Sequence, residues 1–162
     1  MYHIDYIDEK IVNYFNDKLD HYIKDNYRMN KKIHNVATLK GFQTPNIVKN
    51  IEASVKKQLL KNMFQPKDIS HMHLIHYYKG GYQTAHAHPD KEKYSFILYL
   101  NNSDGDTVFM FKERVIMEKP TKGKIIFFTP QIPHKAKISY KNKRILVGAI
   151  EQEMRRKNLS LS

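Results

Sequence analysis

The sequence predicts an α+β protein that is mainly β: a jelly roll, or double-stranded β-helix, with two N-terminal helices packed on one face. Three observations lead to this fold class. Apolar residues recur at helical spacing early in the chain, short β-forming segments follow, and clusters of turn residues separate these segments. Short, evenly spaced strands are typical of sandwiches and barrels, so we expect the strands to build the body of the protein.

The length and composition of the chain agree with a single domain over residues 1–162. We expect a helical support region at 1–66, a jelly-roll core at 70–150 and a polar tail at 151–162. The chain has no cysteine, which excludes disulfides, thiolate metal sites and cysteine nucleophiles. It also lacks a long apolar run and a secretory signal pattern. A cytoplasmic protein without a membrane partner is therefore expected.

The net charge is +12, and lysine contributes most of it. A basic surface attracts nucleic acids, acidic proteins or anionic small molecules. The chain contains no arginine-rich run of the kind that binds phosphates. A nucleic-acid partner is therefore an alternative that the charge alone does not favour.

Two helices are expected in the first third of the chain. Residues 7–27 and 46–64 both carry apolar side chains at helical spacing. Thr44 can cap the second helix, Pro45 suits its first turn, and Pro66 closes the helical region. The apolar positions of the two segments are Ile11, Tyr14, Phe15, Leu19, Tyr22 and Ile23, then Ile47, Ile51, Val55, Leu59 and Met63.

From Ser70 onward the chain changes to short segments rich in β-branched and aromatic residues. Turn residues such as the glycine pair at 80–81 and the cluster at 101–106 separate them. The expected strands are residues 72–78, 94–100, 107–111, 114–119, 124–128, 135–139 and 144–150.

A group of potential metal ligands stands at alternate positions: His86, His88 and Asp90. Alternate residues of an extended segment point to the same side. A His-x-carboxylate pair and one distant histidine form a facial triad, which leaves positions on iron open. His134 follows an expected strand and a proline turn, and can supply that distant histidine. Arg144, at the start of the last strand, offers a bidentate fork for a carboxylate.

Six motifs follow one another along the β-region. They are YYKGGY at 77–82, HPD at 88–90, YSFILYLN at 94–101, DGDTVFMF at 104–111, KPTKGKIIFFTPQIPH at 119–134 and KRILVGAI at 143–150. In this order the motifs resemble the iron(II)- and 2-oxoglutarate-dependent dioxygenases of the prolyl-4-hydroxylase-like branch. The resemblance covers residues 74–150.

The resemblance implies an iron(II) site made of His88, Asp90 and His134. This set is favoured because a carboxylate lowers the net charge on the iron. In the alternative register, His86 and His88 are the ligands and form a three-histidine site with His134. The sequence leaves both sets open, with His86 as the alternative ligand.

The resemblance also implies residues that bind 2-oxoglutarate. The residue ten positions after His134 is Arg144, which would pair with the distal carboxylate of the cosubstrate. Tyr99 resembles a tyrosine that hydrogen-bonds the same carboxylate, and Tyr78 (or Tyr77) resembles one that lines the cosubstrate pocket. No catalytic residue is expected beyond the metal and cosubstrate ligands. Ascorbate is a further cofactor candidate.

The expected activity is hydroxylation of a C–H bond with 2-oxoglutarate and O2 as cosubstrates. The resemblance implies a peptide or protein substrate, with hydroxylation of a peptidyl proline or another peptidyl side chain. Alkylation-repair members of the superfamily carry a second arginine where this chain has Ile150, so a nucleic-acid substrate is not favoured. Two alternatives remain: a cupin-like roll that binds a metal or small acid without oxygenase activity, and a basic nucleic-acid-binding module.

Overall fold

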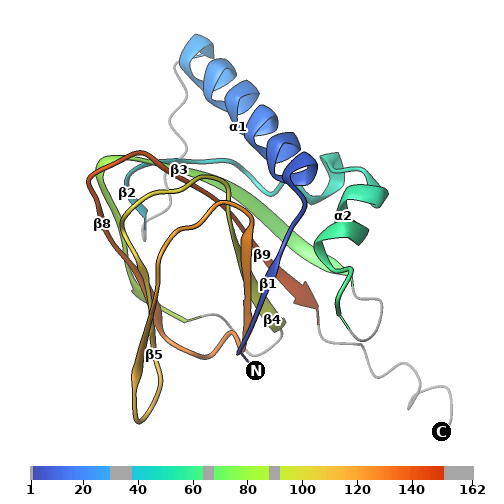
Figure 1. Ribbon diagram of the computed structural model, residues 1–162. Helices are drawn as coiled ribbons and strands as arrows, with labels where there is room; N and C mark the ends of the chain where they lie inside the picture. Colours follow the sequence, from blue (N-terminus) through green and yellow to red (C-terminus); the bar gives the residue numbers. More distant parts are fainter. Residues whose placement is uncertain (1, 30–37, 64–67, 88–91, 152–162) are drawn as a thin grey trace, which may run out of the picture.

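The computed structural model describes residues 2–29, 38–63, 68–87 and 92–151 (Figure 1). Within these residues the chain forms nine strands, two α-helices and one 3-10 helix. The elements, in chain order, are β1 (Tyr2–Tyr6), α1 (Glu9–Met29), β2 (Thr38–Gln43), the 3-10 helix η1 (Val48–Asn50), α2 (Ala53–Leu59), β3 (Ile69–His86), β4 (Glu92–Tyr99), β5 (Thr107–Met110), β6 (Val115–Glu118), β7 (Lys124–Phe128), β8 (His134–Ser139) and β9 (Lys143–Glu151).

The strands form one sheet in the order β1-β7-β4-β9-β3-β8-β5-β6, and β2 pairs with β3 outside this path. All the pairs are antiparallel. The sheet curls because the long strand β3 pairs with β9 over its first part and with β8 over its last part (Figure 1). Gly80, between these two parts, has a φ of +86°, which glycine adopts at little cost.

Side chains alternate across the sheet and divide its interior into two cores. On β3, Met72 and Leu74 belong to the core that contains the helices, whereas Ile75 and Tyr77 belong to the core inside the curl. The helices contribute buried residues only to the first core: Val12, Phe15 and Leu19 from α1, and Val55 and Leu59 from α2. The inside of the curl is therefore built by strands alone.

The prediction of a mainly-β chain with two helices and an antiparallel, jelly-roll-like sheet is confirmed. The double-stranded β-helix in its strict sense stays a prediction. All seven expected strand segments lie in strands of the structure, with shifted ends. None of the helices in the described residues has the length and hydrophobicity needed to cross a membrane.

The helical interpretation of residues 1–66 is wrong at two places, because β1 and β2 lie in this region. β1 pairs with β7, with Tyr2 opposite Phe128. β2 pairs with β3, with Gln43 opposite Ile75. Both partners lie far along the chain, so local spacing carries no signal for these strands.

The second helix is also shorter than expected, because residues 44–47 continue along the edge of β3. The backbone N–H of Thr44 donates to Leu74 O, and that of Ile47 donates to Met72 O, at 2.9 Å in both cases. The Thr44 hydroxyl donates to Pro45 O, so it does not cap α2.

We predict that Leu19→Ala lowers the free energy of unfolding by about 2–5 kcal/mol, because it leaves a cavity between α1 and the sheet. Leu19 is fully buried in the core that α1 and the sheet share. Urea unfolding followed by circular dichroism measures the change. Asp17→Ala, on the exposed side of the same helix, is the control and should cost less than about 0.5 kcal/mol. Equal effects of the two substitutions would contradict the packing of α1.

Candidate functional site

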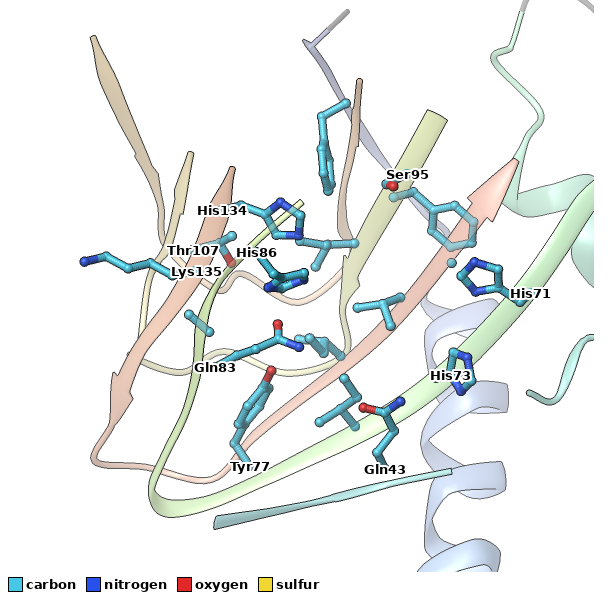
Figure 2. A pocket seen from close by; sticks show the side chains of 18 residues that line it. Gln43, His71, His73, Tyr77, Gln83, His86, Ser95, Thr107, His134 and Lys135 are labelled. Atoms are coloured by element: carbon cyan, nitrogen blue, oxygen red, sulfur yellow. The ribbon is translucent and has the colours of Figure 1, made fainter. Parts of the chain in front are cut away.

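A cavity of about 340 Å³ lies inside the curl of the sheet, and residues from seven strands line it (Figure 2). Histidine and glutamine side chains stand among aliphatic and aromatic ones along its walls. Ten of the 18 lining residues carry a polar side chain, and the other eight are apolar. Such a combination is typical of ligand sites.

His86 and His134 face each other in this cavity. They are register partners at the end of β3 and the start of β8, and their ring centroids are 4.2 Å apart. Phe128 packs edge-on against the His134 ring, at 4.8 Å between centroids. The strand pairing itself thus sets the distance between the two imidazoles.

Each of the two rings contacts a backbone carbonyl two residues earlier, and this contact fixes its tautomer. His86 Nδ1 lies 2.9 Å from Thr84 O, and His134 Nδ1 lies 2.9 Å from Ile132 O. A carbonyl oxygen can only accept, so Nδ1 carries the proton and Nε2 carries the lone pair of the neutral ring. Metal-binding histidines commonly use such a second contact to orient the ring. The pair therefore fits two ligands of a metal such as iron(II).

His88 and Asp90, the other two predicted ligands, lie outside the described residues. Within the part of the chain that the structure describes, no group of three histidine, cysteine, aspartate or glutamate residues is arranged to hold a metal. His86 is thus the predicted candidate that the structure brings to His134. The remaining ligands stay predictions: His88 in the three-histidine set, and both His88 and Asp90 in the other set.

Arg144, the predicted partner of a carboxylate, lies on the face of β9 that α1 covers. Its Nη2 donates to Asp20 Oδ1 at 2.6 Å, and its Nε donates to His76 Nδ1 at 3.0 Å. Burial, together with the charge of Arg144, lowers the pKa of His76 to about 4. This arginine joins α1 to the sheet and does not line the cavity.

Lys143, one residue earlier, points to the other side of β9 and contacts Tyr77 inside the curl, although it is not among the residues that line the cavity; sequence reasoning missed it. It is 1% exposed, its Nζ donates to Gly105 O at 2.6 Å, and it lies 4.5 Å from the ring centroid of Tyr77. Burial lowers the pKa of Lys143 to about 8. The alternation of side chains along a strand could have identified it. Lys143 lies two and four positions before Ile145 and Val147, which line the cavity, so the three side chains point to the same side of β9.

The three predicted tyrosines fall at different places. Tyr99 is buried and donates to Thr107 Oγ1 at 2.6 Å, and burial raises its pKa. Tyr77 lines the cavity. Tyr78 is 45% exposed and packs against the ring of His76, outside the cavity. Tyr77 and Tyr78 are the two alternatives for the pocket tyrosine, and of these Tyr77 lies in the interior of the curl, next to Lys143.

No family model and no curated protein sequence matches this chain. Solved structures do match. A prolyl-4-hydroxylase from Pseudomonas putida is 12% identical with a TM-score of 0.65, covering 94% of this chain and 93% of its own. A prolyl hydroxylase from Trichoplax adhaerens, in complex with a peptide fragment of the hypoxia inducible factor oxygen degradation domain, is 12% identical with a TM-score of 0.66, covering 98% and 86%.

A third match is the viral collagen prolyl hydroxylase of Paramecium Bursaria Chlorella virus-1, in its 2-oxoglutarate complex. It is 18% identical with a TM-score of 0.59, covering 92% of this chain and 94% of its own. The chain has the fold of the prolyl-4-hydroxylase-like oxygenases. At these identities the likeness to prolyl hydroxylases establishes the fold alone.

We predict that the buried Lys143 makes stability increase with pH in the alkaline range. Below its folded pKa of about 8 the ammonium is protonated in both states and opposes folding fully. Between pH 8 and the ordinary value of 10.5, the unfolded chain holds the extra proton. The free energy of unfolding should then rise by up to about 1.4 kcal/mol per pH unit.

Urea unfolding at several pH values measures this slope. Lys143→Met should remove the rise. Lys141→Met, at an exposed position nearby, should retain it. If the two variants have the same slope, the ammonium of Lys143 is not the group responsible.

Proposed function

We propose that the protein is an iron(II)- and 2-oxoglutarate-dependent dioxygenase that hydroxylates a C–H bond of a peptidyl side chain. The observation that carries the proposal is the pair of opposed imidazoles, His86 and His134, with Nε2 as the lone-pair nitrogen of each ring. The pair lies in a cavity, in a chain with the fold of prolyl hydroxylases. In the proposed reaction a substrate C–H, O2 and 2-oxoglutarate give C–OH, succinate and CO2.

The metal would be held by His86 and His134, with a third ligand from the segment that follows His86. His88 is that ligand in the three-histidine set. In the other predicted set, made of His88, Asp90 and His134, His86 is not a ligand. The register pairing of His86 with His134 favours a set that includes His86. When bound, iron(II) supplies the oxidising chemistry with oxygen and the cosubstrate, and ascorbate is proposed as a supporting reductant.

Lys143 is the residue we propose for the distal carboxylate of 2-oxoglutarate, in place of Arg144. A buried ammonium is costly without a counter-charge, and Lys143 contacts a carbonyl oxygen rather than a carboxylate. Tyr77 is next to it, and Tyr99 and Thr107 form a hydrogen-bonded pair in the same core. A carboxylate bound there would offset the cost of burying the charge. Arg144 already pairs with Asp20 on the opposite face.

A peptide substrate is supported by two observations. The Trichoplax relative in fold was solved with a peptide fragment. The net charge of +12 also suits an acidic peptide or protein partner. A peptidyl side chain is accordingly the proposed target, and proline is the residue that the resemblance implies.

We predict that His134→Ala abolishes succinate formation from 2-oxoglutarate in the presence of iron(II) and oxygen, because it removes one proposed metal ligand. Succinate is measured with the purified protein, and iron binding is measured separately by metal analysis. His21→Ala, on the exposed side of α1, serves as the control and should be fully active. Unchanged succinate formation by the His134 variant would exclude the proposed activity. Metal binding without succinate in the unaltered protein would instead indicate a binding protein.

We predict that Lys143→Met raises the KM for 2-oxoglutarate by about 10–100-fold, the range for losing a hydrogen bond to a charged group. Arg144→Met should change this KM less than about twofold and act mainly on stability, through its lost contacts with α1. Succinate formation at varied 2-oxoglutarate concentration separates the two variants. The reverse outcome would assign the carboxylate to Arg144.

A further inference from the structure

A second group of polar side chains lies at the other end of the cavity, away from His86 and His134. Gln43 and His73 are neighbours there (Figure 2). Gln43 is the register partner of Ile75, and His73 is two positions earlier on the same face of β3. This wall plays no part in the proposed metal or cosubstrate sites.

Gln43 has a buried acceptor without a partner. The residue is 9% exposed, and its Oε1 is buried with no hydrogen bond among the described residues. Leaving such an atom unsatisfied costs about 1–3 kcal/mol. A ligand that donates a hydrogen bond into the cavity would remove this cost.

His73 adds a second acceptor. Its Nδ1 lies 3.0 Å from Thr44 O, so Nδ1 carries the proton and Nε2 carries the lone pair of the neutral ring. Burial lowers the pKa of His73, which favours the neutral ring. Together with Gln43 Oε1, this end of the cavity offers two acceptors for a donor group.

The charges around the wall restrict the kind of donor. No aspartate or glutamate lines the cavity among the described residues. A cationic side chain would therefore be buried without a counter-charge. A carboxylate would meet two acceptors, Gln43 Oε1 and His73 Nε2, with Gln43 Nε2 as the one donor of the pair. Proline carries neither an N–H nor an O–H donor. An uncharged donor is the group that this wall fits.

We propose, on the basis of the oxygenase function above, that Gln43 and His73 select a substrate side chain with an uncharged hydrogen-bond donor. The side chains of this class are the carboxamides of asparagine and glutamine and the hydroxyls of serine and threonine. The wall receives the polar end of the substrate side chain while the opposed histidines hold the metal. Prolyl, lysyl and purely apolar side chains are rejected because each leaves a group unsatisfied at this wall.

Short peptides that differ only in one central residue test the inference. The central residue is asparagine, glutamine, serine, threonine, proline, lysine or leucine. Each peptide is incubated with protein, iron(II) and 2-oxoglutarate, and the mass gain of one oxygen atom is measured by mass spectrometry. Peptides with a carboxamide or hydroxyl should gain oxygen at least tenfold faster than the others, since one hydrogen-bond mismatch changes kcat/KM by this factor or more.

Gln43→Leu should lower kcat/KM for the preferred peptides at least tenfold while the KM for 2-oxoglutarate and peptide-independent succinate formation stay unchanged. Gln58→Leu makes the same replacement at an exposed position of α2 and should have no effect. Gln43→Glu keeps the shape of the side chain and adds a counter-charge, so it should bring the lysine peptide into use.

The outcomes separate the two proposals. Preference for proline or leucine, no effect of Gln43→Leu, or no modified peptide while succinate still forms would each overturn the role of Gln43 and His73. A protein that forms no succinate at all would instead overturn the oxygenase function on which this inference rests.

Discussion

The site depends on one strand, β3, which pairs with β2, β9 and β8 in succession. Its 18 residues carry His73, Tyr77 and His86 toward the cavity. These side chains reach one cavity because β3 bends between the part that pairs with β9 and the part that pairs with β8. At Gly81 a Cβ atom would come within 2.7 Å of Lys40 O, so a side chain there would push β2 away. The two histidines that face each other therefore depend on a glycine bend well away from them.

Strand alternation also places two neighbouring cations on opposite faces of the sheet. On β9, Lys143 faces the interior of the curl and Arg144 faces α1. A slip of one residue in the pairing of β9 would exchange them, moving the whole set of side chains to the opposite face. Long pairing with both β3 and β4 fixes the register of β9. The stability of the sheet and the chemistry of the cavity are thus specified by the same hydrogen bonds.

The sequence predicts the elements that local patterns encode. The strand at 124–128 and the position of His134 beside a strand follow from apolar runs and proline turns, and both are found as expected. β1 and β2 could not be predicted, because each depends on a partner far along the chain. The spacing from His134 indicates Arg144 as the partner of a carboxylate, whereas the alternation of side chains along β9 places Lys143 inside the curl. Which of the two cations binds a carboxylate stays a prediction. The ligand set around His88 and Asp90 stays a prediction.

A comparison of two buried lysines supports a binding role for the interior of the curl. Lys124 is 8% exposed, and its Nζ lies 3.1 Å from Glu118 Oε2. Glu118 therefore neutralises the charge of Lys124. Tyr2 donates to the same carboxylate at 2.6 Å, so the three residues join β1, β6 and β7. Lys143 is buried more completely, yet no carboxylate of the described residues lies within ion-pair distance of it. Asp104 and Asp106 favour its charged form only from a distance.

An apolar residue at the position of Lys143 would stabilise the fold more than a buried charge does. A buried ammonium without a carboxylate partner is therefore better explained by an anionic ligand than by the packing of the sheet.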